Sequence, residues 1–356
     1  MFQKKQIVFL VLIFFVPHVL SWGFVGHEIT AAIGQQFLSP KVYKKVLELL
    51  PEEAHGNLSF IAAWADQAKF TPEYNFTAPM HYFDTSPLTD NPPSYCSVDW
   101  VPGKVEFDVI TAIHNYSNRL DPNSDLSFLS RSEALKFLVH FLGDLHQPLH
   151  ITSKDKGGNG IPVTFEGHNT NLHSVWDTSI IYKRIREFNE NSTFDHNLPE
   201  NDNRLNSSAP LSEGPFYDLY LNYIIGLMRT TWRNELSSWT VCNEDLKLSH
   251  EHPSSDPNKF HFSSANESSN YFLLSMNQEI SFSAACPEYW VIPVNKLNCQ
   301  IVFKYDPESD LSTGEYYERI VNEKIIEKLL AVAAELNIIF INYFVAMLNT
   351  ILKLKL

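Results

Sequence analysis

Hydrophobic residues recur every three or four positions along most of the chain, which is the spacing of one face of an α-helix. One helix is predicted over Lys41–Leu50, where a serine and a proline supply the N-cap and the first helical position. Another is predicted over Ala134–Leu145, where Ser130 and Glu133 form a capping box. Further helices are predicted over the other periodic segments, residues 26–37, 57–68, 104–120, 171–187, 214–238 and 314–350. The pattern therefore predicts a mainly α protein.

Two segments depart from the helical pattern. In GGNGIPVTFEGH, residues 157–168, Ile161, Val163 and Phe165 alternate with other residues between glycine-rich ends, which predicts a small β-hairpin. Residues 243–270 are polar and have no clear period, so a surface insertion is expected there.

The N-terminus has the organisation of a secretory signal peptide. Lysines precede an apolar run over Ile7–Val16, and Val19 and Ser21 stand three and one residues before a possible cleavage point. The run is shorter than the roughly 20 apolar residues of a membrane span. We therefore expect residues 1–21 to be removed, so that Trp22 becomes the first residue of an exported protein.

The C-terminal segment 329–352 is also apolar and raises the alternative of a membrane anchor. Glu335, Asn337, Asn342 and Asn349 interrupt it, and such polar groups are costly in hydrocarbon. A long buried helix is the preferred interpretation. Because no linker or repeat divides residues 22–356, they are expected to form a single domain.

Charge and cysteine content restrict the chemistry. The formal net charge of -14 excludes a broad electrostatic attraction to nucleic acid, so a site for phosphate needs local positive charge. Four cysteines in an exported chain favour two disulfides, with three possible pairings. Six glycosylation sequons fit an exported glycoprotein, at Asn57, Asn75, Asn115, Asn191, Asn206 and Asn266.

Histidines and aspartates recur at helical spacing in the middle of the chain. In HFLGDLHQPLH, His140 and Asp144 lie on one face of a helix, and the following proline lets His150 turn away from it. A second pair, His173 and Asp177, has the same spacing. One such pair is typical of an ordinary structural hydrogen bond, but two pairs and His150 within 38 residues indicate a polynuclear metal site. Imidazole and carboxylate donors without thiolates favour zinc over manganese or iron.

Two motifs upstream add to these residues. WADQAK carries Asp66 with Lys69 about one turn later, and MHYFDT carries His81 and Asp84 on either side of Tyr82. Taken alone, Asp66 is typical of a solvated helix residue. Together with the other histidines and aspartates, it becomes a candidate metal ligand.

Taken together, these motifs resemble those of a known enzyme family. The chain is similar to the zinc-dependent single-strand-specific nucleases of fungi and plants, which share a superfamily and a mainly helical fold with bacterial zinc phospholipase C. The similarity is strong from Trp22 to about Tyr182 and returns at ACP, residues 285–287, and GEYYE, residues 314–318. It depends on these motifs: Trp22-Gly23-x-x-Gly26-His27, Trp64-Ala65-Asp66, His81-x-x-Asp84, His140-Phe141-x-Gly143-Asp144-x-x-Gln147-Pro148-Leu149-His150, Gly157-Gly158-Asn159 and Asn171-Leu172-His173-x-x-Trp176-Asp177.

The resemblance implies three zinc ions, whereas the spacing alone gives neither their number nor their grouping. The first would be held by the amine and carbonyl of Trp22 with His27 and Asp144. The second would be held by Asp66, His81, His140 and the bridging Asp144, and the third by His150, His173 and Asp177.

The resemblance also implies hydrolysis of single-stranded RNA and DNA to 5'-phosphate products, with 3'-nucleotidase activity. Asp66 would orient the attacking hydroxide, and Lys69 and Asn159 would bind phosphoryl oxygens. Tyr82 would stack on an unpaired base and Asp84 would accept hydrogen bonds from it, although Tyr82 could instead be a core residue. Lys69 stands where many family members carry arginine, which removes bidentate phosphate binding.

The sequence leaves two other functions open. The alternatives are a zinc phospholipase C acting on phospholipid head groups and a non-catalytic zinc-bound exported glycoprotein. We expect a monomer without an obligate protein partner, either secreted or in a lysosome-like or vacuole-like compartment. The disulfides are predicted as Cys96 with Cys242 and Cys286 with Cys299.

Overall fold

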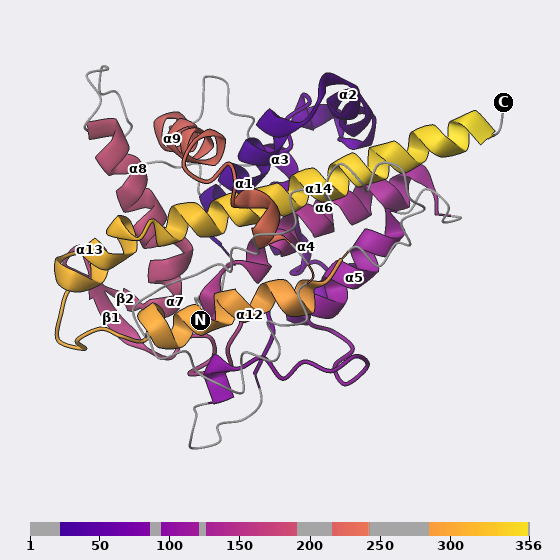
Figure 1. Ribbon diagram of the computed structural model, residues 1–356. Helices are drawn as coiled ribbons and strands as arrows, with labels where there is room; N and C mark the ends of the chain where they lie inside the picture. Colours follow the sequence, from indigo (N-terminus) through magenta and orange to yellow (C-terminus); the bar gives the residue numbers. More distant parts are fainter. Residues whose placement is uncertain are drawn as a thin grey trace, which may run out of the picture.

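Several helices pack around a long C-terminal helix, α14 (Ile325–Leu354), in the computed structural model (Figure 1). The structure describes residues 22–85, 94–120, 126–190, 216–240, 242 and 285–354. The predicted signal peptide, the predicted insertion at 243–270 and the sequons at Asn191, Asn206 and Asn266 lie outside these residues.

Four helices form the centre of the hydrophobic core. Helices α1 (Phe24–Phe37) and α6 (Phe128–Leu145) both pack against α14, and α5 (Val109–Arg119) packs on α6. Buried residues occur on all sides of α14 between positions 325 and 341, which is typical of a core helix. No helix within the described ranges is long and apolar enough to cross a membrane. The expectation of a buried C-terminal helix is therefore confirmed as far as the described side chains extend.

The predicted helices exist, but their ends differ. Ser39 caps α2 (Pro40–Leu49) by accepting a hydrogen bond from the Val42 amide, as the sequence predicts. Helix α6 begins earlier than predicted, because Ser127 caps it. The predicted capping box is wrong: Ser130 lies inside the helix, and Glu133 accepts a hydrogen bond from the Tyr74 hydroxyl at 2.8 Å.

Some predicted helices are interrupted. The segment 314–350 divides at Lys324, which has a left-handed φ of 53° that a continuous α-helix does not allow. It forms α13 (Gly314–Asn322) and α14. Three other predicted helices are also divided into shorter elements. The segment 57–68 contains α3 (Ser59–Ala62) and α4 (Trp64–Ala68), the segment 171–187 contains α7 (Leu172–Ser174), the π-helical η5 (Val175–Ser179) and the start of α8 (Ile180–Glu190), and the segment 214–238 contains α9 (Asp218–Arg229) and most of η7 (Leu236–Trp239). Short helical turns complete the described elements: η1 (Glu52–Ala54), η2 (Asn75–His81), η3 (Ser94–Cys96) and η4 (Pro148–His150).

One helix was missed by the sequence analysis. Helix α12 (Pro287–Leu297) continues into the π-helical turn η8 (Asn298–Val302). It contains Pro293, and an interior proline ordinarily indicates a helix end because it cannot donate the backbone hydrogen bond. Tertiary packing overrides this signal, since residues on most of α12 are buried.

The hairpin is confirmed. Strands β1 (Pro162–Phe165) and β2 (His168–Asn171) pair antiparallel, with Val163 opposite Thr170. The Asp310 carboxylate closes the turn from outside by accepting hydrogen bonds from the backbone amides of Glu166 at 3.0 Å and Gly167 at 2.7 Å. Strand β2 leads directly into α7, which carries His173.

The disulfide pairing differs from the prediction. Cys96 pairs with Cys299, and Cys242 pairs with Cys286, with Cα atoms 5.8 and 5.6 Å apart respectively. The predicted pairing is wrong because η3 packs against η8, 203 residues later in the chain. Sequence spacing contains no information on that contact, and a disulfide requires the two Cα atoms to be within about 7 Å.

Candidate metal centre

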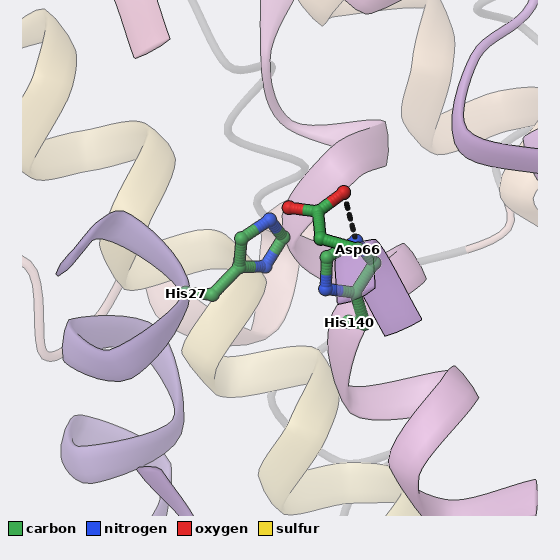
Figure 2. Close-up of side chains that lie close together, drawn as sticks. All are labelled: His27, Asp66 and His140. Carbon is green, nitrogen blue, oxygen red and sulfur yellow. Dashed lines mark ion pairs between the residues drawn. The ribbon is translucent and has the colours of Figure 1, made fainter. Parts of the chain in front are cut away.

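Residues from four elements meet in the interior beside α6. His27 lies in the first turn of α1, Asp66 in α4, His81 at the end of η2, and His140 and Asp144 on α6. All five side chains are buried. Figure 2 shows His27, Asp66 and His140 facing one another. The rings of His27 and His140 are stacked, and their centroids are 3.9 Å apart. The i, i+4 spacing of His140 and Asp144 places both on one helix face, as the sequence predicts.

Asp144 lies at the centre of this arrangement. Its Oδ2 atom is 2.9 Å from His81 Nδ1 and 3.1 Å from His140 Nε2. Its Oδ1 atom is 3.4 Å from both His27 Nε2 and His150 Nδ1. One buried carboxylate therefore contacts four imidazoles, two with each oxygen.

A separate group of donors, His150, His173 and Asp177, lies next to Asp144. His173 Nε2 is 2.9 Å from Asp177 Oδ2, and His150 Nε2 is 3.7 Å from Asp177 Oδ1. The rings of His150 and His173 are stacked, with centroids 5.1 Å apart. Because His150 contacts both aspartates, it connects this group to the first cluster.

The donor atoms fall into three groups that could each hold a metal ion, with all donors of a group within 4.8 Å of one another. The groups are His27 with Asp66 and His140, His81 with His140 and Asp144, and His150 with His173 and Asp177. The third group is the one that the resemblance implies. The other two groups share His140. In the structure His27 is grouped with Asp66 and His140, whereas the resemblance implies a group of His27 with Trp22 and Asp144. The first five residues thus form one continuous cluster with more than one possible division.

Backbone carbonyls orient two of the histidines from behind. His140 Nδ1 donates to the Ala62 oxygen at 2.7 Å, and His173 Nδ1 donates to the Gly157 oxygen at 2.6 Å. A carbonyl only accepts, so these bonds place the proton on Nδ1 and leave Nε2 facing the carboxylates. This is the arrangement in which histidine side chains commonly bind metals.

Close packing around the cluster requires glycine at one helical position. A Cβ atom at residue 143 would lie 2.6 Å from His27 Nδ1, well inside normal contact distance. Gly143 therefore allows the His27 ring to approach the backbone of α6. A larger residue would push His27 away from Asp144.

Burial and charge shift the pKa values in opposite directions within the cluster. Burial opposes charge on His140, but the carboxylates of Asp144 and Asp66 outweigh it and raise the pKa of His140 to about 10. At His81 burial dominates and lowers the pKa to about 4, and burial also lowers the pKa of His27. The two carboxylates therefore favour a positive charge between them, which is a charge that a bound cation would supply.

The donor set fits a divalent metal. Asp66 Oδ2 and Asp144 Oδ1 are buried and accept no hydrogen bond from the described residues. Buried carboxylate oxygens that accept no hydrogen bond are costly, and a bound cation would satisfy them. Histidine and carboxylate donors are among the ligands that zinc takes in proteins.

Trp22 lies at the edge of this region. Its side chain is fully buried, and the backbone amide of the next residue, Gly23, donates to the backbone oxygen of Asp177 at 2.8 Å. The start of the described chain is thereby fixed beside the third group. Whether Trp22 is itself a terminal residue and a ligand remains a prediction, because residues 1–21 lie outside the described part of the chain.

Lys69, Tyr82 and Asp84 lie around the cluster of buried donors rather than within it. Lys69 Nζ is 2.7 Å from Asp66 Oδ1, so a positive charge lies directly at the cluster. Tyr82 is 42% exposed and is not a core residue, and Asp84 is also exposed. Desolvation raises the pKa of Tyr82, and the nearby charge of Asp84 adds to the rise.

Asn159 is the exception among the predicted residues. It lies in the turn that follows Gly157, and its side-chain amide donates to the Lys156 backbone oxygen at 2.8 Å. Within the described ranges it forms none of the hydrogen bonds or ion pairs that connect the cluster residues. Its predicted contact with a phosphoryl group stays a prediction.

The structure adds three residues to which the sequence analysis gave no role. Buried Gln147 donates to Asp177 Oδ1 and accepts from the Leu149 amide. Asn295 and Asn298, both fully buried on α12 and η8, donate to backbone oxygens of the segment that carries His150. Gln147 belongs to the motif His140–His150 and was therefore detectable in the sequence, whereas the asparagines are about 150 residues away from that motif.

Comparison with known proteins agrees with this geometry. The family model described as S1/P1 Nuclease matches residues 22–335. The chain belongs to the S1/P1 nuclease family. This S1/P1 family member contains its candidate metal groups and the exposed Tyr82 within the matched residues.

Individual relatives cover different shares of this S1/P1 family chain. Nuclease S1 of Aspergillus oryzae is 40% identical over 164 residues, which are 45% of this chain and 54% of that protein. Nuclease P1 of Penicillium citrinum is 40% identical over 170 residues, 46% of this chain and 60% of that protein. These matches thus span little more than half the length of the fungal relatives. Endonuclease 2 of Arabidopsis thaliana is 28% identical over 347 residues, 92% of this chain and 94% of that protein.

Proposed function

We propose that this protein is a zinc-dependent nuclease that hydrolyses phosphodiester bonds of single-stranded RNA and DNA, leaving 5'-phosphates. The observation that carries the proposal is the contact of the Asp144 carboxylate with four histidines of three adjoining donor groups. Membership of the S1/P1 nuclease family and the names of the relatives support it. The same centre would also remove phosphate from 3'-nucleotides.

The buried histidines and aspartates would hold the metals. In the division that we propose, Trp22, His27 and Asp144 hold one zinc ion, Asp66, His81, His140 and Asp144 a second, and His150, His173 and Asp177 a third. Bound zinc would supply Lewis acidity toward phosphoryl oxygens and would lower the pKa of water.

Residues of the chain itself would position the reacting groups. Asp66 Oδ2, which accepts no hydrogen bond from the described residues, is available to orient a water molecule or to take its proton. Lys69 Nζ carries a positive charge that could neutralise a phosphoryl oxygen. Asn159 would add a neutral donor to the same phosphate.

Preference for single strands would follow from the exposed side chains next to the cluster. The Tyr82 ring can stack on a base only if that base is not already stacked in a duplex. Asp84, which is exposed two residues after Tyr82, can accept hydrogen bonds from base N–H groups that pairing would otherwise occupy.

One assay tests the function against its nearest rival. The purified protein would be incubated with single-stranded RNA, single-stranded DNA, duplex DNA, 3'-AMP and phosphatidylcholine, each with and without a chelator. We expect cleavage of both single strands and 3'-AMP, slower cleavage of duplex, and loss of all activity on chelation. Turnover of lipid without cleavage of nucleic acid would identify a phospholipase C. Activity that survives thorough chelation would contradict the metal chemistry.

We also propose that the protein is exported after cleavage before Trp22, which would create the terminal amine of the first zinc group. The family match that starts at residue 22 supports this, as does the buried position of Trp22. The sequon asparagines Asn57, Asn75 and Asn115 are exposed and so accessible to glycosylation. N-terminal sequencing of the exported protein would test the cleavage, and any start other than Trp22 would contradict it.

A further inference from the structure

Two exposed aromatic residues each follow a residue that contacts the same carboxylate oxygen. Lys69 Nζ is 2.7 Å from Asp66 Oδ1, and the next residue is Phe70. His81 Nδ1 is 3.5 Å from Asp66 Oδ1, and the next residue is Tyr82. Consecutive Cα atoms are about 3.8 Å apart, so each aromatic residue begins next to a residue that contacts the cluster.

The Phe70 ring is the more exposed of the two. Phe70 is 58% exposed and Tyr82 is 42% exposed. Lys69 Nζ lies 5.7 Å from the centre of the Phe70 ring, so the ring is near the charge that would bind a phosphate. A single exposed hydrophobic residue is common on proteins and needs no explanation by itself. Phe70 differs because its ring lies near Lys69 Nζ, which contacts a candidate metal ligand.

The backbone that carries Phe70 is held in place. The Phe70 amide donates to the Gln67 oxygen at 3.3 Å, and both the amide and the hydroxyl of Thr71 donate to the Ala68 oxygen at 2.8 Å. A few residues later the Tyr74 hydroxyl donates to Glu133 on α6, so the segment is fixed to the core. The ring therefore projects from an ordered turn, and little conformational entropy of the backbone would be lost when a ligand stacks on it.

We propose that Phe70 is a second base-stacking residue, for the nucleotide that neighbours the one on Tyr82. The inference rests on the proposed function. Aromatic side chains bind unpaired bases of any sequence through their faces, and the positive charge of Lys69 beside the Phe70 ring suits the phosphate that connects two such bases. With Phe70, the protein would bind a strand at two consecutive bases, with Lys69 at the phosphate between them. The bases of a duplex are already stacked on one another and cannot make these stacking contacts.

The test uses a single-stranded tetranucleotide in which only the central linkage is a phosphodiester and the others are methylphosphonates. For Phe70→Ala we expect kcat/KM to fall by about five-fold to about a hundred-fold, the range that one base–aromatic stack contributes, mainly through KM. Phe70→Trp should restore it. Phe76 is 50% exposed in the same segment and does not follow a residue of the cluster, so Phe76→Ala is the matched control and should behave as wild type.

An abasic scan separates stacking from a structural effect. Removing one base at a time should reveal a position beside the scissile linkage where wild type loses the same factor and Phe70→Ala loses nothing further. Equal kcat/KM for wild type and Phe70→Ala, or an equal loss in Phe76→Ala, would overturn the assignment to Phe70. If wild type cleaved no single-stranded nucleic acid, the proposed function itself would fail, so the two failures are distinguishable.

Discussion

The side-chain amide of Asn298 donates a hydrogen bond to the backbone oxygen of Pro148 at 2.7 Å. Pro148 stands two residues before His150, whose Nδ1 atom is 3.4 Å from Asp144. Asn295 supports the other side of the same turn by donating to the Ile151 oxygen at 2.6 Å. The position of a candidate metal ligand thus depends on a helix that lies about 150 residues later in the chain.

Replacing Asn298 should therefore weaken both the fold and the metal centre. In Asn298→Ala the buried Pro148 oxygen loses this donor but keeps the Ile151 amide, so the free energy of unfolding should fall by about 0.5 to 1.5 kcal/mol, the net contribution of one hydrogen bond. Chemical denaturation with elemental analysis of the purified variant would measure both effects, and we expect less bound metal than in wild type. Exposed Asn118→Ala on α5 is the control. Equal stability and metal content in both variants would show that the hydrogen bond has no such role.

Asp144→Asn should remove more than one metal ion. Each oxygen of Asp144 faces a different pair of histidines, and an amide replaces one of these anionic oxygens with an NH2 group that cannot bind a cation. Asp177→Asn changes a residue that contacts only His150 and His173 among the candidate ligands, so it should cost no more than one ion. Elemental analysis of the two variants gives the comparison. A full metal load in Asp144→Asn would contradict a bridging role.

Gln147→Leu should weaken the third donor group without disturbing the first two. Leucine keeps most of the side-chain volume but removes the donor to Asp177 Oδ1 and the acceptor for the Leu149 amide. Loss of such a supporting contact typically weakens metal binding by about 10-fold to 100-fold. Competition with a chromogenic chelator would measure this loss. Gln36→Leu on the exposed side of α1 should show no change, and the prediction fails if both variants release metal alike.

Asp310 should stabilise the hairpin in a pH-dependent way. Desolvation opposes its charge, but hydrogen bonds from Ser312, Gly167 and Glu166 outweigh it and lower the pKa of Asp310 to about 2. A carboxylate with a depressed pKa contributes stability above its ordinary pKa near 4, and this contribution is lost as the pH falls through the folded-state value.

We therefore expect Asp310→Asn to lower the melting temperature at pH 6, with a difference from wild type that shrinks between about pH 4 and pH 2. Thermal unfolding followed by circular dichroism across this range would measure it. Glu308→Gln, an exposed change in the same loop, should leave the melting temperature unaltered. A difference that stays constant with pH would show that the charge of Asp310 makes no contribution.

The sequence by itself determined the helical class, the hairpin and the residue types at the centre. These features are local: a helix places His140 and Asp144 on one face, and His173 and Asp177 likewise, whatever surrounds them. The alternation of Val163 and Phe165 similarly predicts a strand without reference to the rest of the chain. The motifs around these residues were also sufficient to indicate the nuclease family.

Only the tertiary structure decided which distant residues meet. His27, Asp66 and His81 join the α6 pair because α1, α4 and η2 pack against that helix, and their sequence spacing does not encode this packing. The Cys96–Cys299 disulfide and the support of the His150 turn by α12 and η8 depend on contacts across about 150 to 200 residues. Burial of hydrophobic surface drives such contacts, and because that force is non-directional, a pattern of apolar residues predicts which face is covered but not by which partner.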